Sequence, residues 1–311
     1  MRMAANVQTV LARRRLQEVS SQLDPEFVED LLHAPQLTEH DLQSQQHRVK
    51  ELQTKLADME QTPAVRDLMS VADHLLRRSV WIIGGDGWAY DIGSGGVDHV
   101  LASGRDVNVL VLDTEVYSNT GGQASKSTPL GAVAKFASAG KPTAKKDMAL
   151  QAIAYGSVYV ARVALGADPQ QTLRAFREAE AYPGPSLIIA YSHCIAHGYD
   201  LRNGLDQQYK AVHCGHWPLM RYNPVLADEG RNPFLLDSPK PDETWREYTK
   251  LELRYRMLQK AHPEEAERML DLGQRQVERR YAEYAEMASR TAEGFAVDAR
   301  MSEFAASSNR A

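Results

Sequence analysis

Residues 1–78 carry apolar side chains at helical spacing. Asp24 followed by Pro25 is typical of a helix N-cap with a proline in the first turn, and apolar residues follow at helical intervals. The same intervals predict a helix within 42–59 and another over 67–78. This part of the chain is therefore expected to consist of helices.

The opening segment, 1–17, is basic and could pass for a transit peptide. It lacks the apolar centre of a signal peptide, however, and acidic residues follow from Glu18. An ordinary amphipathic helix is the preferred interpretation, with Val7, Val10 and Leu11 spaced to lie on one face.

From residue 79 the pattern changes to short, nearly continuous apolar runs that are rich in β-branched residues. Strands are predicted at 80–85, 108–113, 158–163 and 186–191. Such runs are typical of a parallel sheet that is covered on both faces. Helical stretches separate them, at 97–103, 146–155 and 170–181. The alternation predicts an α/β fold with an open, mostly parallel sheet, helices on both faces, and ligands at the carboxyl ends of the strands.

Beyond His193 the periodic pattern is lost, and a loop rich in Gly, Pro and Asn is expected up to residue 242. Two helices are predicted after it, at 243–260 and 263–288. The inner stripe of the second helix would consist of Met269, Val277, Tyr281, Tyr284 and Ala288. The predicted division is a helical lead-in segment, an α/β domain, C-terminal helices and a disordered tail, at 1–78, 79–240, 241–290 and 291–311.

Composition argues against several classes of protein. The chain has 311 residues, 43% hydrophobic content and a net charge of −5, which suits one large or two small globular domains. A pI near 6.1 gives no support for a nucleic-acid partner. A mean hydropathy of −0.45, without an apolar run of membrane length, argues against a membrane-spanning helix. With only two cysteines, Cys194 and Cys214, we expect a reducing, cytoplasmic location.

The segment GGDGWAYDIGSGG, 84–96, ends the first predicted strand and opens a helix, as a phosphate-binding turn does. Glycines let the backbone approach a ligand closely, and the helix N-terminus supplies N–H groups. A dinucleotide-binding turn fits poorly, because Asp86 would meet a bare pyrophosphate with a like charge. A divalent cation between them removes that conflict, and Mg²⁺ takes such oxygen ligands. The alternative is that Asp86 merely caps the helix.

The second predicted strand brings further oxygen atoms to the same edge of the sheet. TEVYSNTGGQ follows it directly and contains Thr114, Val116 and Asn119. Alternate residues of an extended segment point the same way, so the Thr114 side chain and the Val116 carbonyl could complete a cation site. We therefore predict that Asp86 and Asn119 lie at one edge of the sheet.

A GDG sequence followed about thirty residues later by an asparagine at a strand end resembles the thiamine-diphosphate signature. GDGWAYDIG and LDTEVYSNTGGQ, with AKFA, GK, YSHCIAHG and WPLMRYNP further on, resemble the pyruvate:ferredoxin (flavodoxin) oxidoreductase family in particular. The resemblance runs over about residues 1–288. It implies the thiamine-diphosphate-binding fold, incomplete at its N-terminal side, with added N- and C-terminal helices.

The resemblance also implies roles for individual residues. The Mg²⁺ ligands would be Asp86, Thr114 and the carbonyl of Val116. Asn119 would face the thiazolium ring and the 2-oxoacid, which makes it the candidate catalytic residue. The cofactor-binding set is then Gly85, Asp86, Gly87, Thr114, Val116 and Asn119.

Cys194, at the end of the fourth predicted strand, matches the remote fourth cysteine of the family's proximal [4Fe–4S] cluster. Such a cluster needs four thiolates, and this chain lacks the other three, so it would form only with cysteines from elsewhere. A buried free cysteine is the alternative. Zinc is another, because histidines flank both cysteines, although their spacing matches no known zinc pattern. The resemblance implies no role for Cys214.

The activity that the resemblance implies is oxidative decarboxylation of pyruvate to acetyl-coenzyme A, with electrons passed through iron–sulfur clusters to ferredoxin or flavodoxin. This chain would supply the thiamine-diphosphate-binding portion. It would depend on N-terminal domains or a separately encoded subunit, would form a dimer when complete, and is expected to be inactive alone. Two alternatives are a redox-free thiamine-diphosphate decarboxylase or carboligase, and a non-catalytic truncated remnant.

Overall fold

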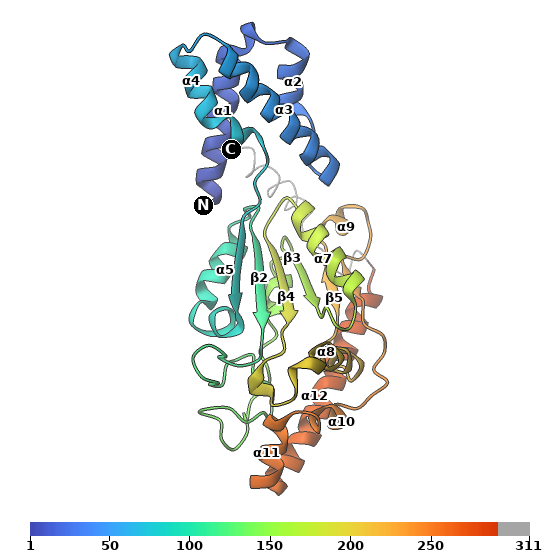
Figure 1. Ribbon diagram of the computed structural model, residues 1–311. Helices are drawn as coiled ribbons and strands as arrows, with labels where there is room; N and C mark the ends of the chain where they lie inside the picture. The colour runs from blue at the N-terminus through green and yellow to red at the C-terminus, as the bar shows by residue number, and fades with distance from the viewer. Residues whose placement is uncertain (292–311) are drawn as a thin grey trace. The chain divides into compact units, whose positions relative to one another are not determined.

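The computed structural model describes residues 1–291, and the chain divides into two compact units between Val80 and Trp81 (Figure 1). The first unit consists of helices, and the second contains a sheet. The predicted tail at 291–311 lies, apart from its first residue, outside the described residues. The division into four segments stays a prediction.

Four α-helices build the first unit, α1 (Arg2–Val19), α2 (Pro25–His33), α3 (Glu39–Asp58) and α4 (Pro63–Val71). Short 3-10 helices follow α1 and α4, at Ser20–Gln22 and Ala72–Leu75. The predicted cap of α2 is confirmed, because the Asp24 side chain accepts a hydrogen bond from the backbone N–H of Phe27. The helix predicted over 67–78 begins earlier, at Pro63, where Thr62 caps it.

The buried stripe of α1 differs from the predicted one. Val7 and Val10 are 64% and 61% exposed, whereas Ala12, Leu16 and Val19 are buried in the core of the unit. Both sets have helical spacing, so the sequence predicted the helix correctly but its buried face wrongly. The choice between the faces depends on where α4 packs against α1, which is a tertiary contact.

A six-stranded sheet in the order β1-β2-β4-β3-β5-β6 forms the second unit's centre. Its strands are β1 (Trp81–Gly85), β2 (Asn108–Asp113), β3 (Tyr159–Val163), β4 (Ser186–Tyr191), β5 (Met220–Tyr222) and β6 (Phe234–Leu236). The pairs among β1 to β4 are parallel, and β5 pairs antiparallel with both β3 and β6. The four predicted strands and the open, mostly parallel sheet are confirmed.

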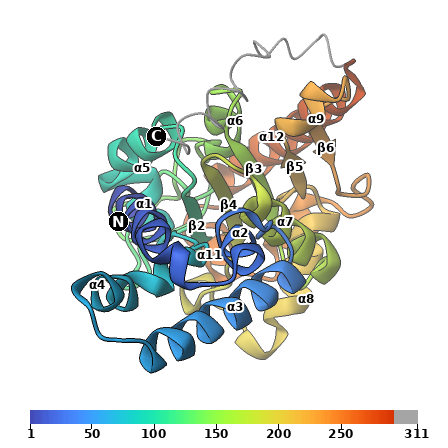
Figure 2. The same ribbon diagram turned by 90° about the horizontal axis from the view of Figure 1, so that it is seen from above.

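Helices cover both faces of this sheet, as predicted. α5 (Ser94–Ala102) and α6 (Met148–Ile153) pack on one face, in a core with Val109 and Val111 of β2. α7 (Pro169–Ala181) packs on the other face against β3 and β4. Figure 2 shows α5 and α6 on the side of the strands opposite to α7. This layering leaves the carboxyl ends of β1, β2 and β4 at one edge, since these strands are parallel.

The loop predicted after His193 is wrong over much of its length. It contains α8 (Gly204–His213), the four-residue helix α9 (Val225–Asp228), and the strands β5 and β6. Two 3-10 helices precede α8, at Ile195–His197 and Leu201–Asn203. β5 and β6 are three residues long and exist through pairing with β3 and with each other, so no local period marks them.

The helix predicted over 243–260 is two helices, α10 (Trp245–Thr249) and α11 (Leu253–Ala261). Glu252 separates them in an extended conformation. Its carboxylate is buried and accepts hydrogen bonds from the Tyr248 hydroxyl at 2.8 Å and the Gln207 amide at 3.0 Å. We infer that these hydrogen bonds to the buried carboxylate stabilise the extended conformation at Glu252 more than a continued helix would.

The last helix, α12 (Pro263–Ser289), agrees with its prediction within one residue. Met269, Val277 and Tyr284 of the predicted stripe are buried, while Tyr281 and Ala288 are partly exposed. Among the described residues, no helix is long and apolar enough to span a membrane.

We predict opposite effects for alanine at two helical glycines of the second unit. An added Cβ at Gly273 would lie 2.0 Å from a ring carbon of the buried Trp245, so Gly273→Ala should lower the free energy of unfolding by about 1–3 kcal/mol. At Gly96, an exposed position of α5, an added Cβ meets nothing within 4 Å. Gly96→Ala should therefore raise it by about 0.5–1 kcal/mol.

Urea unfolding followed by tryptophan fluorescence measures both effects. All four tryptophans lie between residues 81 and 245, so the signal reports on the second unit alone. Equal changes of the same sign at both positions would contradict the packing of α12 against Trp245.

Candidate functional site

Asp86 is the first residue after β1, and it is only 1% exposed. The chain continues as a π-helical turn over Gly87–Ile92, a conformation that is frequent at functional sites. The Asp86 side chain makes no capping hydrogen bond to this turn. The alternative that Asp86 merely caps the helix is therefore wrong.

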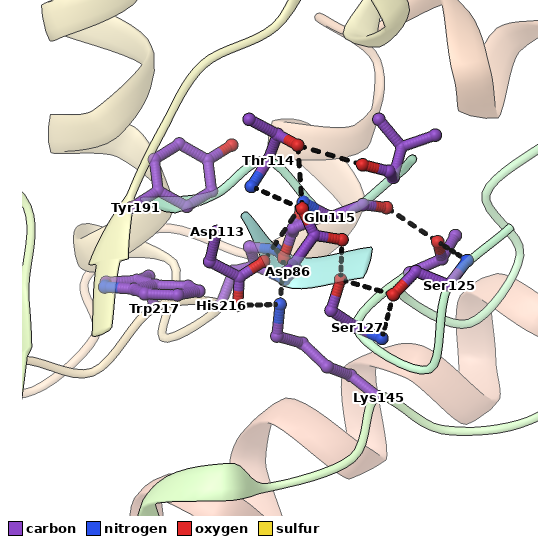
Figure 3. A network of polar contacts seen from close by, with 12 residues as sticks. Asp86, Asp113, Thr114, Glu115, Ser125, Ser127, Lys145, Tyr191, His216 and Trp217 are labelled. Atoms are coloured by element: carbon purple, nitrogen blue, oxygen red, sulfur yellow. Dashed lines mark hydrogen bonds and ion pairs between the residues drawn. The ribbon is translucent and has the colours of Figure 1, made fainter. Parts of the chain in front are cut away.

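The Asp86 carboxylate instead binds the turn after β2 and a serine further along (Figure 3). Oδ1 accepts hydrogen bonds from the backbone N–H of Thr114 at 3.2 Å and from its hydroxyl at 2.8 Å. Oδ2 accepts one from the Ser127 hydroxyl at 2.5 Å. The Thr114 hydroxyl also lies 3.0 Å from the carbonyl oxygen of Val116. The three predicted Mg²⁺ ligands thus lie together.

The spacing of these oxygen atoms fits a magnesium ion. Mg²⁺ binds oxygen octahedrally at about 2.0–2.1 Å, so adjacent ligands lie roughly 2.8–3.0 Å apart. The Thr114 hydroxyl has the required spacing to both Asp86 Oδ1 and the Val116 carbonyl, at 2.8 and 3.0 Å. It carries one proton for two acceptors, so without a cation it can donate to only one of them, although Asp86 Oδ1 also accepts from the Thr114 N–H. A shared cation would satisfy all three oxygens.

Burial raises the pKa of Asp86 from 3.8 to about 6, and the neighbouring Asp113 carboxylate adds to the rise. Hydrogen bonds from Ser127 and Thr114 and the charge of Lys145 oppose this rise without cancelling it. A bound divalent cation would lower the pKa of Asp86, because its charge favours the ionised carboxylate.

The two glycines that flank Asp86 differ in their surroundings. Gly87 is buried, and an added Cβ would lie 2.5 Å from the Tyr117 ring, so a larger residue would displace that ring. Gly85 is exposed, and its nearest neighbour would be the Leu112 carbonyl at 4.0 Å. Gly85 therefore leaves room for a ligand beside Asp86.

Asn119 lies on the same connection as Thr114, in an exposed turn. The turn is closed by a hydrogen bond from the Gly122 N–H to the Tyr117 carbonyl at 2.8 Å. Gly121 and Gly122 have φ values of +110° and +87°, which L side chains rarely adopt. Asn119 thus follows the proposed metal ligands at the same edge of the sheet, and its role toward a substrate stays a prediction.

Cys194 follows β4 and is 8% exposed. Its Sγ accepts a hydrogen bond from the Ala196 N–H at 3.5 Å. The adjoining 3-10 helix is connected to the turn after β2, because His197 Nε2 donates to the Thr114 carbonyl at 2.8 Å. Burial lowers the pKa of His197 to about 4, so the ring is neutral at pH 7. Cys194 therefore sits at the same sheet edge, and its role as a cluster ligand stays a prediction.

The zinc alternative finds no support. Among residues 1–291, no group of three or more His, Cys, Asp or Glu side chains is arranged to hold a metal ion. Cys214 is buried at the end of α8, where its Sγ donates to the Ala211 carbonyl. Burial raises the pKa of the Cys214 thiol well above its usual value.

A cluster of buried charges lies around Glu115, which the sequence interpretation missed (Figure 3). Lys145 Nζ lies 2.8 Å from Asp113 Oδ2 and 3.2 Å from Glu115 Oε1. His216 Nε2 lies 2.9 Å from Glu115 Oε1, and Arg254 Nη2 lies 2.7 Å from Oε2. Burial acts to raise the pKa of Glu115, but His216, Lys145 and Arg254 together hold it well below its usual range.

Ser127 and the Glu115 cluster could not have been found by spacing. Ser127 lies in an irregular loop, and the partners of Glu115 come from positions 145, 216 and 254. The one available signal was the position of Glu115 between two predicted ligands, Thr114 and Val116. An acidic residue there needs either a metal or a cation of the protein.

Residues 68–190 match the family described as the C-terminal TPP binding domain of thiamine pyrophosphate enzymes. The matched range contains β1 to β4 and the turns that carry Asp86, Thr114 and Asn119. Fold and match together define a thiamine-pyrophosphate-binding domain.

The chain is 51% identical to the pyruvate-flavodoxin oxidoreductase of a Nostoc species over 294 residues, which are 93% of this chain and 24% of that protein. It is 55% identical to the pyruvate:ferredoxin oxidoreductase of Moorella thermoacetica over 222 residues, 71% of this chain and 19% of that protein. It belongs to the pyruvate:ferredoxin (flavodoxin) oxidoreductase family and corresponds to its thiamine-pyrophosphate-binding part. The chain spans about a fifth to a quarter of the length of these relatives.

A solved 2-oxoglutarate:ferredoxin oxidoreductase from Magnetococcus marinus, with 2-oxoglutarate, coenzyme A and succinyl-CoA bound, covers 37% of this chain and 40% of its own, at 26% identity. The TM-score of this similarity is 0.34.

In the metal-free chain, Asp86 should make the second unit less stable as the pH rises. Its pKa is about 6 when folded and 3.8 when unfolded, so the folded state holds the extra proton between these values. The penalty should grow through this window to about 2–3 kcal/mol at pH 7.5. Asp86→Asn should abolish it.

Urea unfolding in the presence of a chelator, at pH 4.5 and 7.5, with tryptophan fluorescence as the signal, tests this. An Asp86→Asn chain with the same pH dependence as the unmodified chain would show that Asp86 ionises normally.

Proposed function

We propose that this chain binds thiamine diphosphate through Mg²⁺ as part of a pyruvate:ferredoxin or flavodoxin oxidoreductase. The observation that carries the proposal is the contact of the Thr114 hydroxyl with both Asp86 Oδ1 and the Val116 carbonyl, at separations that suit an octahedral ion. The family membership supports it, because its named relatives are pyruvate oxidoreductases.

In this proposal each residue has a distinct task. Asp86, Thr114 and the Val116 carbonyl hold Mg²⁺, which neutralises the diphosphate. Ser127 occupies Asp86 Oδ2 and so keeps Oδ1 turned toward the ion. The backbone at Gly85 and Gly87 would bind the diphosphate, and Asn119 would face the reacting centre. Thiamine diphosphate, when bound, supplies the carbanion chemistry of 2-oxoacid decarboxylation.

The electron-transfer part of the proposal rests on Cys194. A [4Fe–4S] cluster requires four thiolates, and the chain has two cysteines in all. Cys194 would therefore supply one ligand, and the others would come from polypeptide that this chain does not contain. Pyruvate, coenzyme A and ferredoxin or flavodoxin are then partners of the complete enzyme. A redox-free decarboxylase or carboligase is not favoured, because the named relatives are oxidoreductases.

Calorimetry of the full chain with thiamine diphosphate tests this function. We expect weak binding that requires Mg²⁺ and is lost in Asp86→Ala. Removing even an indirect partner of a metal typically costs about 10–100-fold in affinity, and removing the only carboxylate ligand should cost at least as much.

Asp98→Ala is the matched control. Asp98 is an exposed aspartate on α5 whose carboxylate binds the Tyr155 hydroxyl and none of the site residues named above. It should leave Mg²⁺-dependent binding unchanged. Tight binding without Mg²⁺ that survives Asp86→Ala would contradict the site, and no binding at all would favour a non-catalytic remnant.

A further inference from the structure

We propose that Arg254 of α11 is a positioning residue for the metal-binding turn and acts through Glu115. This inference rests on the proposed function, because it assumes that Thr114 and Val116 bind the ion. Arg254 belongs to α11 and lies outside the matched range 68–190. The inference therefore gives a C-terminal helix a role at the site.

Glu115 determines the path of the chain between two proposed ligands. Its φ is +58°, in the left-handed region, and Phe136 is the other non-glycine residue among those described with a positive φ. Such a conformation persists only where surrounding contacts enforce it. The reversal at Glu115 brings the Val116 carbonyl back to 3.0 Å from the Thr114 hydroxyl. If Glu115 relaxed, the carbonyl would leave the proposed ion.

Contacts hold both the backbone and the side chain of Glu115 in place. Its backbone N–H donates to Asp113 Oδ1 at 3.0 Å, and its carbonyl accepts from the Thr128 hydroxyl at 2.6 Å. Its fully buried carboxylate binds Lys145 and His216 through Oε1 and Arg254 through Oε2. Of these partners, Arg254 is the one that binds Oε2 and comes from a C-terminal helix.

Arg254 is itself fixed in place. Its Nε donates to Glu252 Oε2 at 2.6 Å, and its Nη2 donates to Glu115 Oε2 at 2.7 Å. Its backbone carbonyl accepts from the Val133 N–H at 3.0 Å. The planar guanidinium can span two carboxylates in a fixed geometry, and a lysine ammonium cannot reproduce this. Arg254→Lys therefore keeps the positive charge but removes the planar group that binds both Glu252 and Glu115.

Arg221 offers a matched control in the same unit. It is also buried, and it bridges Asp237 and Glu178 at the β5 side of the sheet. Arg221→Lys should also destabilise the fold, because it too replaces a guanidinium that bridges two carboxylates. Arg221 does not contact the turn after β2, however.

The test uses two measurements on the full chain. Mn²⁺ serves as the probe, since it prefers the same oxygen ligands as Mg²⁺, and its free concentration is followed by electron paramagnetic resonance. Hydrogen exchange of the peptide 113–117 reports the turn without any metal. Arg254→Lys should weaken Mn²⁺ binding about 10–100-fold and speed exchange at 113–117. Arg221→Lys should change neither.

If Arg254→Lys does not fold, as judged by tryptophan fluorescence, Glu115→Gly replaces it. Glycine accepts the positive φ but removes the carboxylate, so we expect the same loss of Mn²⁺ affinity and the same faster exchange. Unchanged Mn²⁺ affinity and exchange in Arg254→Lys or, in its place, Glu115→Gly would overturn the inference. So would equal losses in Arg221→Lys.

Failure of the metal site itself has a different signature. If the unmodified chain and Asp86→Asn bind Mn²⁺ equally, the proposed function is wrong at this site. The exchange of peptide 113–117 in Arg254→Lys still decides whether Arg254 holds the turn.

Discussion

The structure at the carboxyl edge of the sheet depends on how the negative charges of three buried carboxylates are balanced. Asp86, Asp113 and Glu115 are 1%, 0% and 0% exposed, and a buried charge without a partner is strongly destabilising. Asp113 and Glu115 form ion pairs with basic side chains of the protein, including Lys145. The described hydrogen bonds to Asp86 come from neutral groups alone, those of Thr114 and Ser127. Asp86 is thus the carboxylate for which an external cation would supply the missing charge.

This constraint connects parts of the second unit that are far apart in sequence. Glu115 follows β2, its partner His216 precedes β5, and Arg254 belongs to α11. Because these groups are buried together, the C-terminal helices and the turn after β2 are linked by a shared network of buried charges. The interruption between α10 and α11 has the same origin, since Glu252 is buried there against Arg254.

The sequence was most informative where local pattern and chemistry coincide. The four parallel strands are continuous apolar runs, so both their existence and their shared carboxyl edge followed from the sequence. Asp86 and Thr114 could be paired because each comes directly after one of those strands. The buried face of α1 could not be chosen in this way, because two sets of residues have the same spacing and packing against α4 selects one.

The sequence by itself determined the fold class, the family resemblance and the three candidate ligands Asp86, Thr114 and Val116. Only the tertiary structure decided which groups hold them. Ser127 and Arg254 approach the turn from loops and helices that no spacing rule relates to it. The physical reason is that strand pattern depends on neighbouring residues, whereas compensation of a buried charge depends on whichever residues the fold brings within hydrogen-bonding distance.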